Sequence, residues 1–266
     1  MRYGWGGRVT DDLFTLRDRV AIVTGGAGQL GTEIVRGLSE RGAKVAIFDI
    51  AADDSDDCYQ IDVTERSAIE QATATVLERW GAPHVLVNAA ALDSSPDAPA
   101  EEVGPVESYP QESFDQVMNV NVKGTFLCCQ VVGARMAAAG RGSIVNVSSV
   151  YGMLSPVQDI YDFRRRKGET FFKPVAYSVS KSALYNLTRY LATYWAKSGV
   201  RVNTLTLAGV WNDQPKEFID AYTARMPIGR MAEAREVVGP VVFLVSDASS
   251  YVTGANLVVD GGWSAW

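Results

Sequence analysis

The stretch TGGAGQLG, residues 24–31, decides the fold of this chain. It follows the apolar run VAIV, residues 20–23, and opens a helical pattern, so it predicts a turn from a buried strand into a helix. Glycines in such a turn let backbone N–H groups approach an anionic ligand at the helix N-terminus. The spacing of Gly25, Gly28 and Gly31 differs from the usual G-x-G-x-x-G, and no Gly-Lys-Ser/Thr of a P-loop follows. We interpret the stretch as a candidate pyrophosphate site, with an ordinary tight turn as the alternative.

Short apolar runs alternate with helical patterns along the rest of the chain. Strand-like runs rich in Val and Ile occur at 19–24, 44–49, 84–88, 142–148, 200–205 and 256–260. Helical patterns occur at 30–41, 64–80, 111–139 with a break near Asn121, 177–198 and 233–247. Strands this apolar are covered on both faces, and alternation of strand and helix gives a parallel sheet. The sequence predicts an α/β fold, a single-domain Rossmann-type doubly wound parallel sheet with helices on both faces.

Two segments interrupt the alternation. Residues 49–57 contain five aspartates and predict a short solvated loop. Residues 151–176 are aromatic and basic without a clear period, and long irregular loops inside compact domains are often functional. Because no linker or repeat divides the chain, we expect an N-terminal extension at 1–15 and a single dinucleotide-binding and catalytic domain at 16–266.

The composition argues against several classes of protein. A net charge of −6 over 266 residues disfavours a surface for nucleic acid or an anionic membrane, and no apolar run is long enough for a membrane span. The three cysteines have no metal-binding spacing and indicate a reducing cytoplasm. His84 is the single histidine and lies in a strand-like run, which nearly excludes Ser-His-Asp hydrolysis. We expect no metal, no nucleic acid and no membrane partner.

Asp49 indicates the type of dinucleotide. It ends the second strand-like run, 18 residues after Gly31, where the dinucleotide pattern has an acidic residue that binds the adenosine ribose. A carboxylate at this position repels a 2′-phosphate, and no Lys or Arg lies between Lys44 and Arg66 to bind one. The sequence therefore predicts NAD rather than NADP, with a solvated loop carboxylate as the alternative.

Tyr177 and Lys181 are the candidate reactive pair. They stand four residues apart in AYSVSKSAL, within a predicted helix, and so share one face. A phenol has a pKa of about 10, and a nearby ammonium group favours its ionised form. Tyr177 would then exchange a proton with a substrate oxygen. Ser149 ends a strand-like run and Asn121 lies at the helix break, and both are further candidates.

This ordered set of motifs resembles the short-chain dehydrogenase/reductase family, in its single-domain branch, over about residues 16–262. The matching motifs, in chain order, are TGGAGQLG, Asp49, DV at 62–63, NAAA at 88–91, Asn121, NVSS at 146–149, YSVSK at 177–181 and the closing VVDGG. One Y-x-x-x-K alone is weak, whereas the ordered set at family spacing is specific.

The resemblance implies roles for the matching residues. Tyr177 would be the general acid/base, Lys181 would lower its pKa and bind the nicotinamide ribose, and Ser149 would hold the substrate oxygen. Asn121 would hold a water molecule of a proton relay, and Asn88 would lie along the adenosine part of the cofactor. The implied cofactor-binding residues are Gly25, Gly28, Gln29, Leu30, Gly31, Asp49, Asp62, Val63, Asn88, Ala89, Tyr177, Lys181, Gly209 and Val210.

The chain also departs from the family pattern. Gln29 stands where the family has its middle glycine, and Ala89 stands where it has an asparagine that supports the sheet. The larger departure is the separation of 28 residues between Ser149 and Tyr177, about twice the usual gap. We predict that 151–176 is an inserted wall of the substrate pocket, and the resemblance implies a substrate lid at 207–230.

The candidate substrate-binding residues follow from these segments. They are Ser149, Tyr151, Arg164, Arg165, Phe172, Tyr177 and Trp211. The basic run 164–167 is a candidate site for a carboxylate, phosphate or sulfonate on the substrate. The alternative for this run is a solvated face paired with Asp159, Asp162 and Glu169, or a subunit contact.

We predict an NAD-dependent oxidoreductase that transfers a hydride between nicotinamide and a secondary alcohol or ketone, most readily a polyol, sugar or sugar acid. A carbonyl reductase for ketoacyl or steroid-type substrates and a non-catalytic NAD-binding regulator are the alternatives. The resemblance further implies a homotetramer, or a homodimer, with the C-terminal Trp263 and Trp266 at a subunit interface. The predicted location is the cytoplasm.

Overall fold

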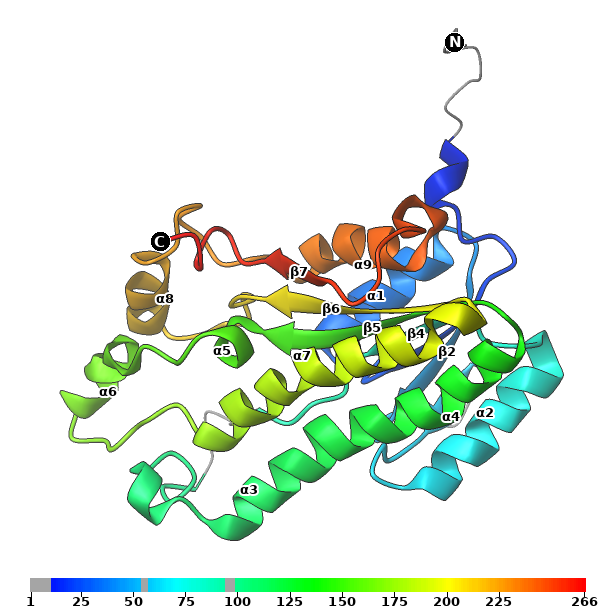
Figure 1. Ribbon diagram of the computed structural model, residues 1–266. Helices are drawn as coiled ribbons and strands as arrows, with labels where there is room; N and C mark the ends of the chain where they lie inside the picture. The colour runs from blue at the N-terminus through cyan, green and yellow to red at the C-terminus, as the bar shows by residue number, and fades with distance from the viewer. Residues whose placement is uncertain (1–10, 54–56, 94–98) are drawn as a thin grey trace, which may run out of the picture.

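The computed structural model describes residues 11–53, 57–93 and 99–266, so most of the predicted N-terminal extension, residues 1–10, lies outside the described residues. The described strands form one parallel sheet of seven strands in the order β3-β2-β1-β4-β5-β6-β7 (Figure 1). The strands are β1 Val20–Thr24, β2 Lys44–Asp49, β3 Cys58–Gln60, β4 Val85–Asn88, β5 Gly142–Ser149, β6 Val200–Leu207 and β7 Asn256–Val259.

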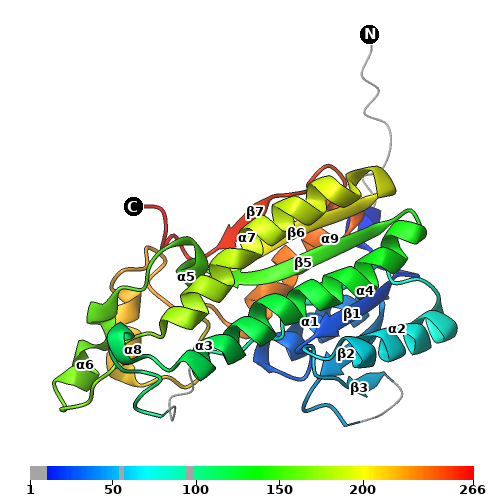
Figure 2. The same cartoon turned by 60° about the horizontal axis from the view of Figure 1, so that its bottom comes forward.

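Helices cover both faces of the sheet. The helices α1 Gln29–Ser39 and α9 Val238–Val245 lie on one face, and α2 Arg66–Trp80, α4 Thr125–Ala138 and α7 Val175–Trp195 lie on the other (Figures 1 and 2). The remaining helices are α3 Gln111–Met118, α5 Val150–Met153, α6 Asp162–Arg165 and α8 Lys216–Thr223. The predicted doubly wound sheet with helices on both faces is confirmed.

Each face of the sheet has its own apolar core. On one face, Ile34 and Leu38 of α1 and Val241 of α9 are buried against β1, β4, β5 and β6. On the other face, Ile69 of α2 and Trp195 of α7 pack with side chains of α4 over the same strands. Alternate side chains of a strand point to opposite faces, so central strands covered on both sides read as continuous apolar runs.

The structure differs from the predicted elements in several places, among them the additional helix α8. It adds β3, a three-residue strand that pairs with β2 from Ile47 to Asp49 and is too short to show a period. The predicted break near Asn121 is a stretch of π-helix, Asn119–Gly124, between α3 and α4. The segment 151–176 is not irregular throughout, because it contains most of α5, a 3₁₀ turn at Gln158–Tyr161 and α6.

The topology fixes where a ligand can bind. The strand order reverses between β1 and β4, and the carboxyl ends of these neighbouring strands leave a crevice because their following helices pack on opposite faces. The glycine-rich turn after β1, the loop after β4 and the ends of β5 and β6 all lie at this edge.

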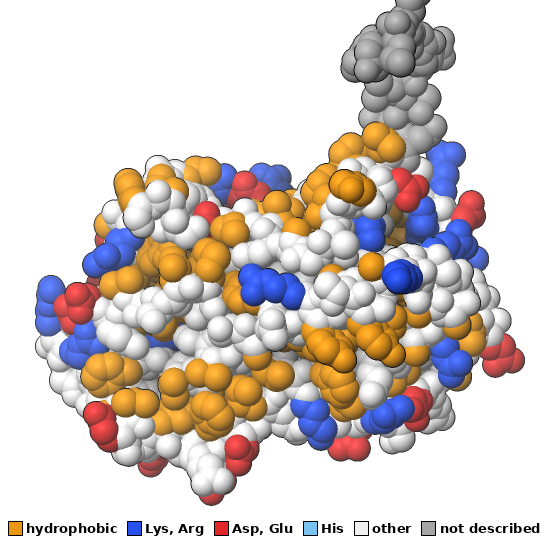
Figure 3. Space-filling model, viewed as in Figure 1, with side chains coloured by type: hydrophobic (Ala, Val, Ile, Leu, Met, Phe, Trp, Pro, Cys, Tyr) orange, Lys and Arg blue, Asp and Glu red, His pale blue; other side chains and the backbone are white. Residues whose placement is uncertain are grey.

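The surface shows charges of both signs. Figure 3 shows Lys and Arg side chains interspersed with Asp and Glu side chains over this face, including the end that carries α6 and α8. No helix within the described residues is long and apolar enough to cross a membrane. Across the same parts of the chain, no group of three or more His, Cys, Asp or Glu side chains is placed to hold a metal ion.

Candidate active site

The glycine-rich turn brings two backbone segments into close contact. Gly25 has a φ of +66°, and a Cβ atom there would lie 2.7 Å from the backbone nitrogen of Ala90. A Cβ atom on Gly31 would lie 2.0 Å from the carbonyl oxygen of Gly25. Both positions require glycine, Gly25 because of its left-handed backbone and Gly31 because α1 starts directly against the turn. The turn therefore holds the N-terminus of α1 close to the end of β1.

A first cavity, which we call the loop cavity, opens beside this turn. Its volume is about 240 Å³, and its lining includes Gly25, Gly28, Asp49, Asp62, Val63 and Ala89. The Asp49 carboxylate accepts a hydrogen bond from Ala27 N at 3.0 Å and another from Ala51 N at 2.9 Å. These two bonds fix the carboxylate between the glycine-rich turn and the end of β2, at the edge of the loop cavity.

Three predicted cofactor-binding residues line neither of the two cavities at this edge of the sheet: Gly31, Asn88 and Gln29. The Asn88 side chain is buried inside the sheet, where Nδ2 donates to Asn146 Oδ1 at 2.9 Å and to Cys129 Sγ at 3.3 Å. Asn88 therefore supports the sheet, and its place along the cofactor stays a prediction. The Gln29 side chain lines neither cavity at this edge and instead donates from Nε2 to the carbonyl oxygen of Trp211 at 2.7 Å.

A second cavity, the inner cavity, adjoins the first at Ala89, which lines both. Its volume is about 270 Å³. The predicted residues in its lining are Leu30, Ala89, Ser149, Tyr151, Tyr177, Lys181, Gly209 and Val210. The structure thus brings together the end of β5, the start of α7 and the segment after β6, which are far apart in the sequence.

Ser149, Tyr177 and Lys181 meet in the inner cavity, with Lys181 Nζ 5.8 Å from the centroid of the Tyr177 ring. Lys181 is buried, and Nζ donates to the carbonyl oxygen of Val147 at 3.0 Å. Burial lowers the pKa of Lys181 to about 8, although the Asp93 carboxylate opposes this change. Burial and, to a smaller extent, the charge of Asp93 raise the pKa of Tyr177, while its hydrogen bond with Ser149 lowers it.

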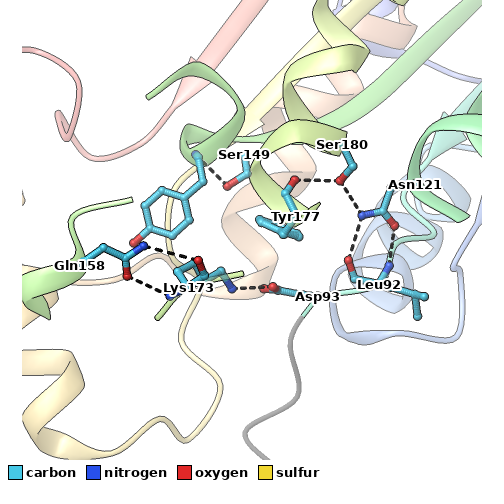
Figure 4. Close-up of polar contacts among 9 residues, drawn as sticks. Leu92, Asp93, Asn121, Ser149, Gln158, Lys173, Tyr177 and Ser180 are labelled. Atoms are coloured by element: carbon cyan, nitrogen blue, oxygen red, sulfur yellow. Dashed lines mark hydrogen bonds and ion pairs between the residues drawn. The ribbon is translucent and has the colours of Figure 1, made fainter. Parts of the chain in front are cut away.

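Asn121 anchors the loop after β4 to α7. Its Nδ2 donates to Leu92 O and to Ser180 Oγ, both at 2.9 Å, and its Oδ1 accepts from Leu92 N at 2.7 Å (Figure 4). Ser180 Oγ in turn donates to the carbonyl oxygen of Tyr177 at 2.8 Å. The Asn121 side chain therefore positions the start of α7, and its predicted role in holding a water molecule stays a prediction.

The inserted segment forms a wall, but not through all the predicted residues. Arg165 donates to Asp162 Oδ1, to Phe171 O and to Gln158 O, so its guanidinium braces the segment itself. Arg164 pairs with Glu169 at 2.6 Å. Arg165 and Phe172 do not line the inner cavity, and their role in substrate binding stays a prediction. Arg164 also lines a third cavity of about 730 Å³, which we call the outer cavity. The ion pairs of Arg164 with Glu169 and of Arg165 with Asp162 match the alternative interpretation of this basic run, a face paired with carboxylates.

The predicted lid is held by aromatic packing. Tyr222 of α8 is buried, its hydroxyl accepts a hydrogen bond from Gly209 N at 2.8 Å, and its ring stacks on Trp263 at 4.3 Å between centroids. Trp263 is thus buried within its own chain, whereas Trp266 is 81% exposed. Trp211 is half exposed and lines none of these cavities, and its role in substrate binding stays a prediction. Whether 207–230 moves as a lid stays a prediction.

The structure also reveals two site residues that the sequence did not indicate. Asp93 and Lys173 line the inner cavity and form an ion pair next to Tyr177 (Figure 4). They are 80 residues apart and belong to no motif, so no spacing in the sequence points to them. Lys173 Nζ lies 4.7 Å from the centroid of the Tyr177 ring. This contact depends on the inserted segment lying against the start of α7, which the sequence alone does not show.

The loop cavity and the inner cavity together define a class of protein. A glycine-rich turn and a fixed carboxylate at the switch point of a doubly wound sheet are typical of dinucleotide binding. A serine, a tyrosine and a lysine in the adjoining cavity supply a hydrogen-bond donor and an acid/base for a carbon–oxygen centre. This combination defines a dinucleotide-dependent oxidoreductase.

Comparison with known proteins identifies the family. A family model described as enoyl-(acyl carrier protein) reductase matches residues 25–264. The chain is 31% identical to an NAD-dependent glycerol dehydrogenase of Listeria innocua, with 96% of this chain and 97% of that protein covered. It is 32% identical to a D-threitol dehydrogenase of Mycolicibacterium smegmatis, with 94% and 95% covered. A solved short-chain dehydrogenase from Leptospira borgpetersenii with bound NAD+ superimposes with a TM-score of 0.82 at 32% identity, with 93% of each chain covered.

The chain therefore belongs to the short-chain dehydrogenase/reductase family and is an oxidoreductase. The family and the fold predicted from the sequence are both confirmed.

Proposed function

We propose that this protein is an NAD-dependent alcohol dehydrogenase that oxidises a secondary hydroxyl group of a polyol, sugar or sugar acid. The observation that carries the proposal is that two neighbouring cavities share Ala89 in their linings, one lined by Asp49 and the other by Ser149, Tyr177 and Lys181. The relatives named for glycerol and D-threitol support the substrate class.

The residues of the loop cavity fit a dinucleotide without a 2′-phosphate. Gly28 directly precedes α1 and lines the loop cavity, so the N-terminus of α1 lies at this cavity, where the helix dipole favours a pyrophosphate. Asp49 would accept hydrogen bonds from the adenosine ribose, and Asp62 and Val63 would lie beside the adenine. Gly209, Val210 and Lys181 would hold the nicotinamide end in the inner cavity. Bound there, NAD supplies the acceptor for the hydride.

The side chains of the inner cavity supply the proton chemistry. Tyr177 accepts the proton of the substrate hydroxyl, and Ser149 hydrogen bonds to the same oxygen. Burial raises the pKa of Tyr177, so the phenol acts as a base only with cations near it. Lys181 and Lys173 provide these charges, at 5.8 and 4.7 Å from the ring centroid. With a pKa of about 8, Lys181 is mainly an ammonium group at neutral pH.

The two alternatives fit less well. A steroid-type substrate requires a large apolar pocket, whereas the charged Asp93 and Lys173 lie at the border between the inner cavity and the outer cavity. A regulator that has lost catalysis has no need of a serine, a tyrosine and a lysine in one cavity, and here all three are present.

The first experiment is a turnover assay. Purified protein is mixed with NAD or NADP and a panel of polyols, aldoses, sugar acids and ketones, and reduced cofactor is followed by absorbance. We expect reduction of NAD with one or more polyhydroxylated alcohols. NAD binding without turnover across the panel would contradict the proposed activity and favour the regulator.

We also infer that the protein is a cytoplasmic homo-oligomer, a homotetramer or a homodimer. Support comes from exposed aromatic side chains on α7, where Tyr190 and Tyr194 stack on one another and are each about two-thirds exposed. Light scattering of the purified protein measures the mass, and a monomer at micromolar concentration would contradict the inference.

A further inference from the structure

The inner cavity and the outer cavity share a neck. Both are lined by Asp93, Tyr161, Lys173, Gln214 and Phe218. Asp93 and Lys173 are the charged members of this set, and they lie beside the Tyr177 ring (Figure 4). A substrate whose reacting carbon lies at Tyr177 and whose chain extends toward the outer cavity must pass this pair.

Lys173 is held rigidly. Its side chain is 9% exposed, and Nζ forms the ion pair with the Asp93 carboxylate. Its backbone nitrogen donates to Gln158 Oε1 at 2.9 Å, and its carbonyl oxygen accepts from Gln158 Nε2 at 3.5 Å. The carbonyl of Gln158 accepts in turn from Arg165 at 2.8 Å. The inserted segment thus fixes the ammonium group before a substrate arrives, as recognition of small ligands requires.

The Asp93 carboxylate is the accessible half of the pair. The Asp93 side chain is 49% exposed, whereas the Lys173 side chain is 9% exposed. A carboxylate has two oxygens and accepts hydrogen bonds from two adjacent hydroxyl groups, and an ammonium group donates to a third oxygen. Hydroxyl groups both donate and accept, so a chain of them can bind to both members without separating the ion pair.

The charges around the neck are balanced. Within the described part of the lining of the outer cavity, each lysine and arginine has a carboxylate partner: Arg164 with Glu169, Lys167 with Glu217 and Lys173 with Asp93. A carboxylate on the substrate would therefore find only cations that are already paired with carboxylates, and the exposed negative charge of Asp93 would repel it. A neutral ligand meets no such repulsion.

We propose that Asp93 and Lys173 are substrate-recognition residues, and that they select a neutral polyhydroxylated alcohol over a sugar acid by binding the hydroxyl groups next to the reacting carbon. The inference rests on the proposed dehydrogenase activity and narrows its substrate class from polyols, sugars and sugar acids to the neutral ones. It also gives the inserted segment a function, since Lys173 belongs to that segment.

The test compares three kinds of alcohol with NAD as the oxidant. They are a four-carbon polyol such as threitol, the sugar acid gluconate, and 2-propanol, which has a secondary hydroxyl and no other. For the wild-type protein we expect the highest kcat/KM with the polyol. In Asp93→Asn and in Lys173→Met, we expect kcat/KM for the polyol to fall about 10- to 100-fold, mainly through KM, because a hydrogen bond to a charged group is lost. Both variants also change the charge beside Tyr177, which affects every alcohol, so the readout is the ratio of kcat/KM for the polyol to kcat/KM for 2-propanol. We expect this ratio to fall about tenfold or more, because 2-propanol makes no such bond.

The matched control is Lys167→Met, which removes a paired lysine from the outer cavity but not from the neck. It should leave the preference for the polyol over 2-propanol unchanged. Circular dichroism and the thermal midpoint identify a variant that fails to fold. If Asp93→Asn is unstable, Lys173→Met carries the test.

The outcomes separate the two proposals. Equal losses for polyol and 2-propanol in both variants, or a wild-type preference for gluconate, would overturn the recognition role while leaving the dehydrogenase activity intact. Absence of NADH with every alcohol would contradict the dehydrogenase activity itself, and the recognition role with it.

Discussion

Gln29 and Trp211 are joined by a hydrogen bond, which Gln29 Nε2 donates to the carbonyl oxygen of Trp211 at 2.7 Å. Gln29 begins α1 directly after the glycine-rich turn, and Trp211 lies in the segment between β6 and α8. The bond links the turn at the loop cavity to the predicted lid over the inner cavity. It exists because this chain has a glutamine where the family has a glycine.

We expect Gln29→Ala to loosen the segment around Trp211. Without the side-chain donor, the segment loses a contact to the body of the sheet, so limited proteolysis within 211–230 should become several-fold faster than in the wild type. Gln29→Glu keeps the size but places an acceptor opposite the carbonyl oxygen, and it should behave like Gln29→Ala. Cleavage at the wild-type rate in both variants would show that the bond does not restrain the segment.

Asp49→Ser should relax the choice of dinucleotide. Removing the carboxylate removes its repulsion of a 2′-phosphate, so the ratio of kcat/KM with NADP to kcat/KM with NAD should rise by about tenfold or more. Asp53→Ser is the control, because Asp53 follows on the same loop but does not line the loop cavity. An unchanged ratio in Asp49→Ser would place the selectivity elsewhere.

Tyr177→Phe should abolish most of the turnover and leave cofactor binding intact. The loss of the acid/base corresponds to a fall in kcat of about 10²- to 10⁴-fold. NAD binding measured by calorimetry should change little, because the phenyl ring keeps its packing. Tyr190→Phe on the exposed side of the same helix should retain full activity. Substantial activity in Tyr177→Phe would exclude the proposed base.

Asp93→Asn should shift the pH dependence of alcohol oxidation to lower pH. The Asp93 carboxylate raises the pKa values of Tyr177 and Lys181, so its neutralisation lowers both and leaves the Lys173 ammonium unpaired beside the Tyr177 ring. The ionised phenol then forms at lower pH, and the acidic limb of the kcat/KM profile moves in that direction. Asp213→Asn, at the outer cavity, should leave the limb in place. A shift to higher pH would contradict the charge relationship.

His84 should make the protein less stable in mild acid. Its Nδ1 accepts a hydrogen bond from Val20 N at 3.0 Å, and burial, together with Arg141 and Arg19, lowers its pKa from 6.5 to about 4. The unfolded chain therefore binds this proton more tightly, so the stability is present above pH 6.5 and is lost as the pH falls from 6.5 toward 4.

The measurement is the free energy of unfolding by urea across this pH range. His84→Asn keeps an acceptor near the Nδ1 position and has no titrating group. The unfolding free energy of this variant should fall less steeply with decreasing pH than that of the wild type. The two slopes should differ by up to about 1.4 kcal/mol per pH unit, the value for one proton. Parallel curves for the two proteins would contradict the prediction.

Local patterns in the sequence predicted the fold and the core of the site. The apolar runs indicated six of the seven described strands, and only β3, with three residues, was missed. The four-residue spacing of Tyr177 and Lys181 placed both on one face of α7, and both line the inner cavity. Such features depend on neighbours within a few residues, so the sequence displays them directly.

Long-range contacts decided the rest. Asn88 follows the family pattern, yet its side chain turns into the sheet because Asn146 and Cys129 offer it buried partners. Arg165 belongs to a basic run typical of anion binding, but the folded segment presents Asp162 and two carbonyl groups that use its donors. Polar groups removed from water must find partners, and the partners are chosen by packing rather than by sequence distance.

The sequence by itself determined that the chain forms a doubly wound sheet with a glycine-rich turn, an acidic strand end and a Ser-Tyr-Lys set, because periodicity and motif spacing encode them. Only the tertiary structure decided which charges face the substrate. Asp93 and Lys173 meet beside Tyr177 because the loop after β4 and the inserted segment converge on the start of α7, and a contact between segments 80 residues apart has no local signal.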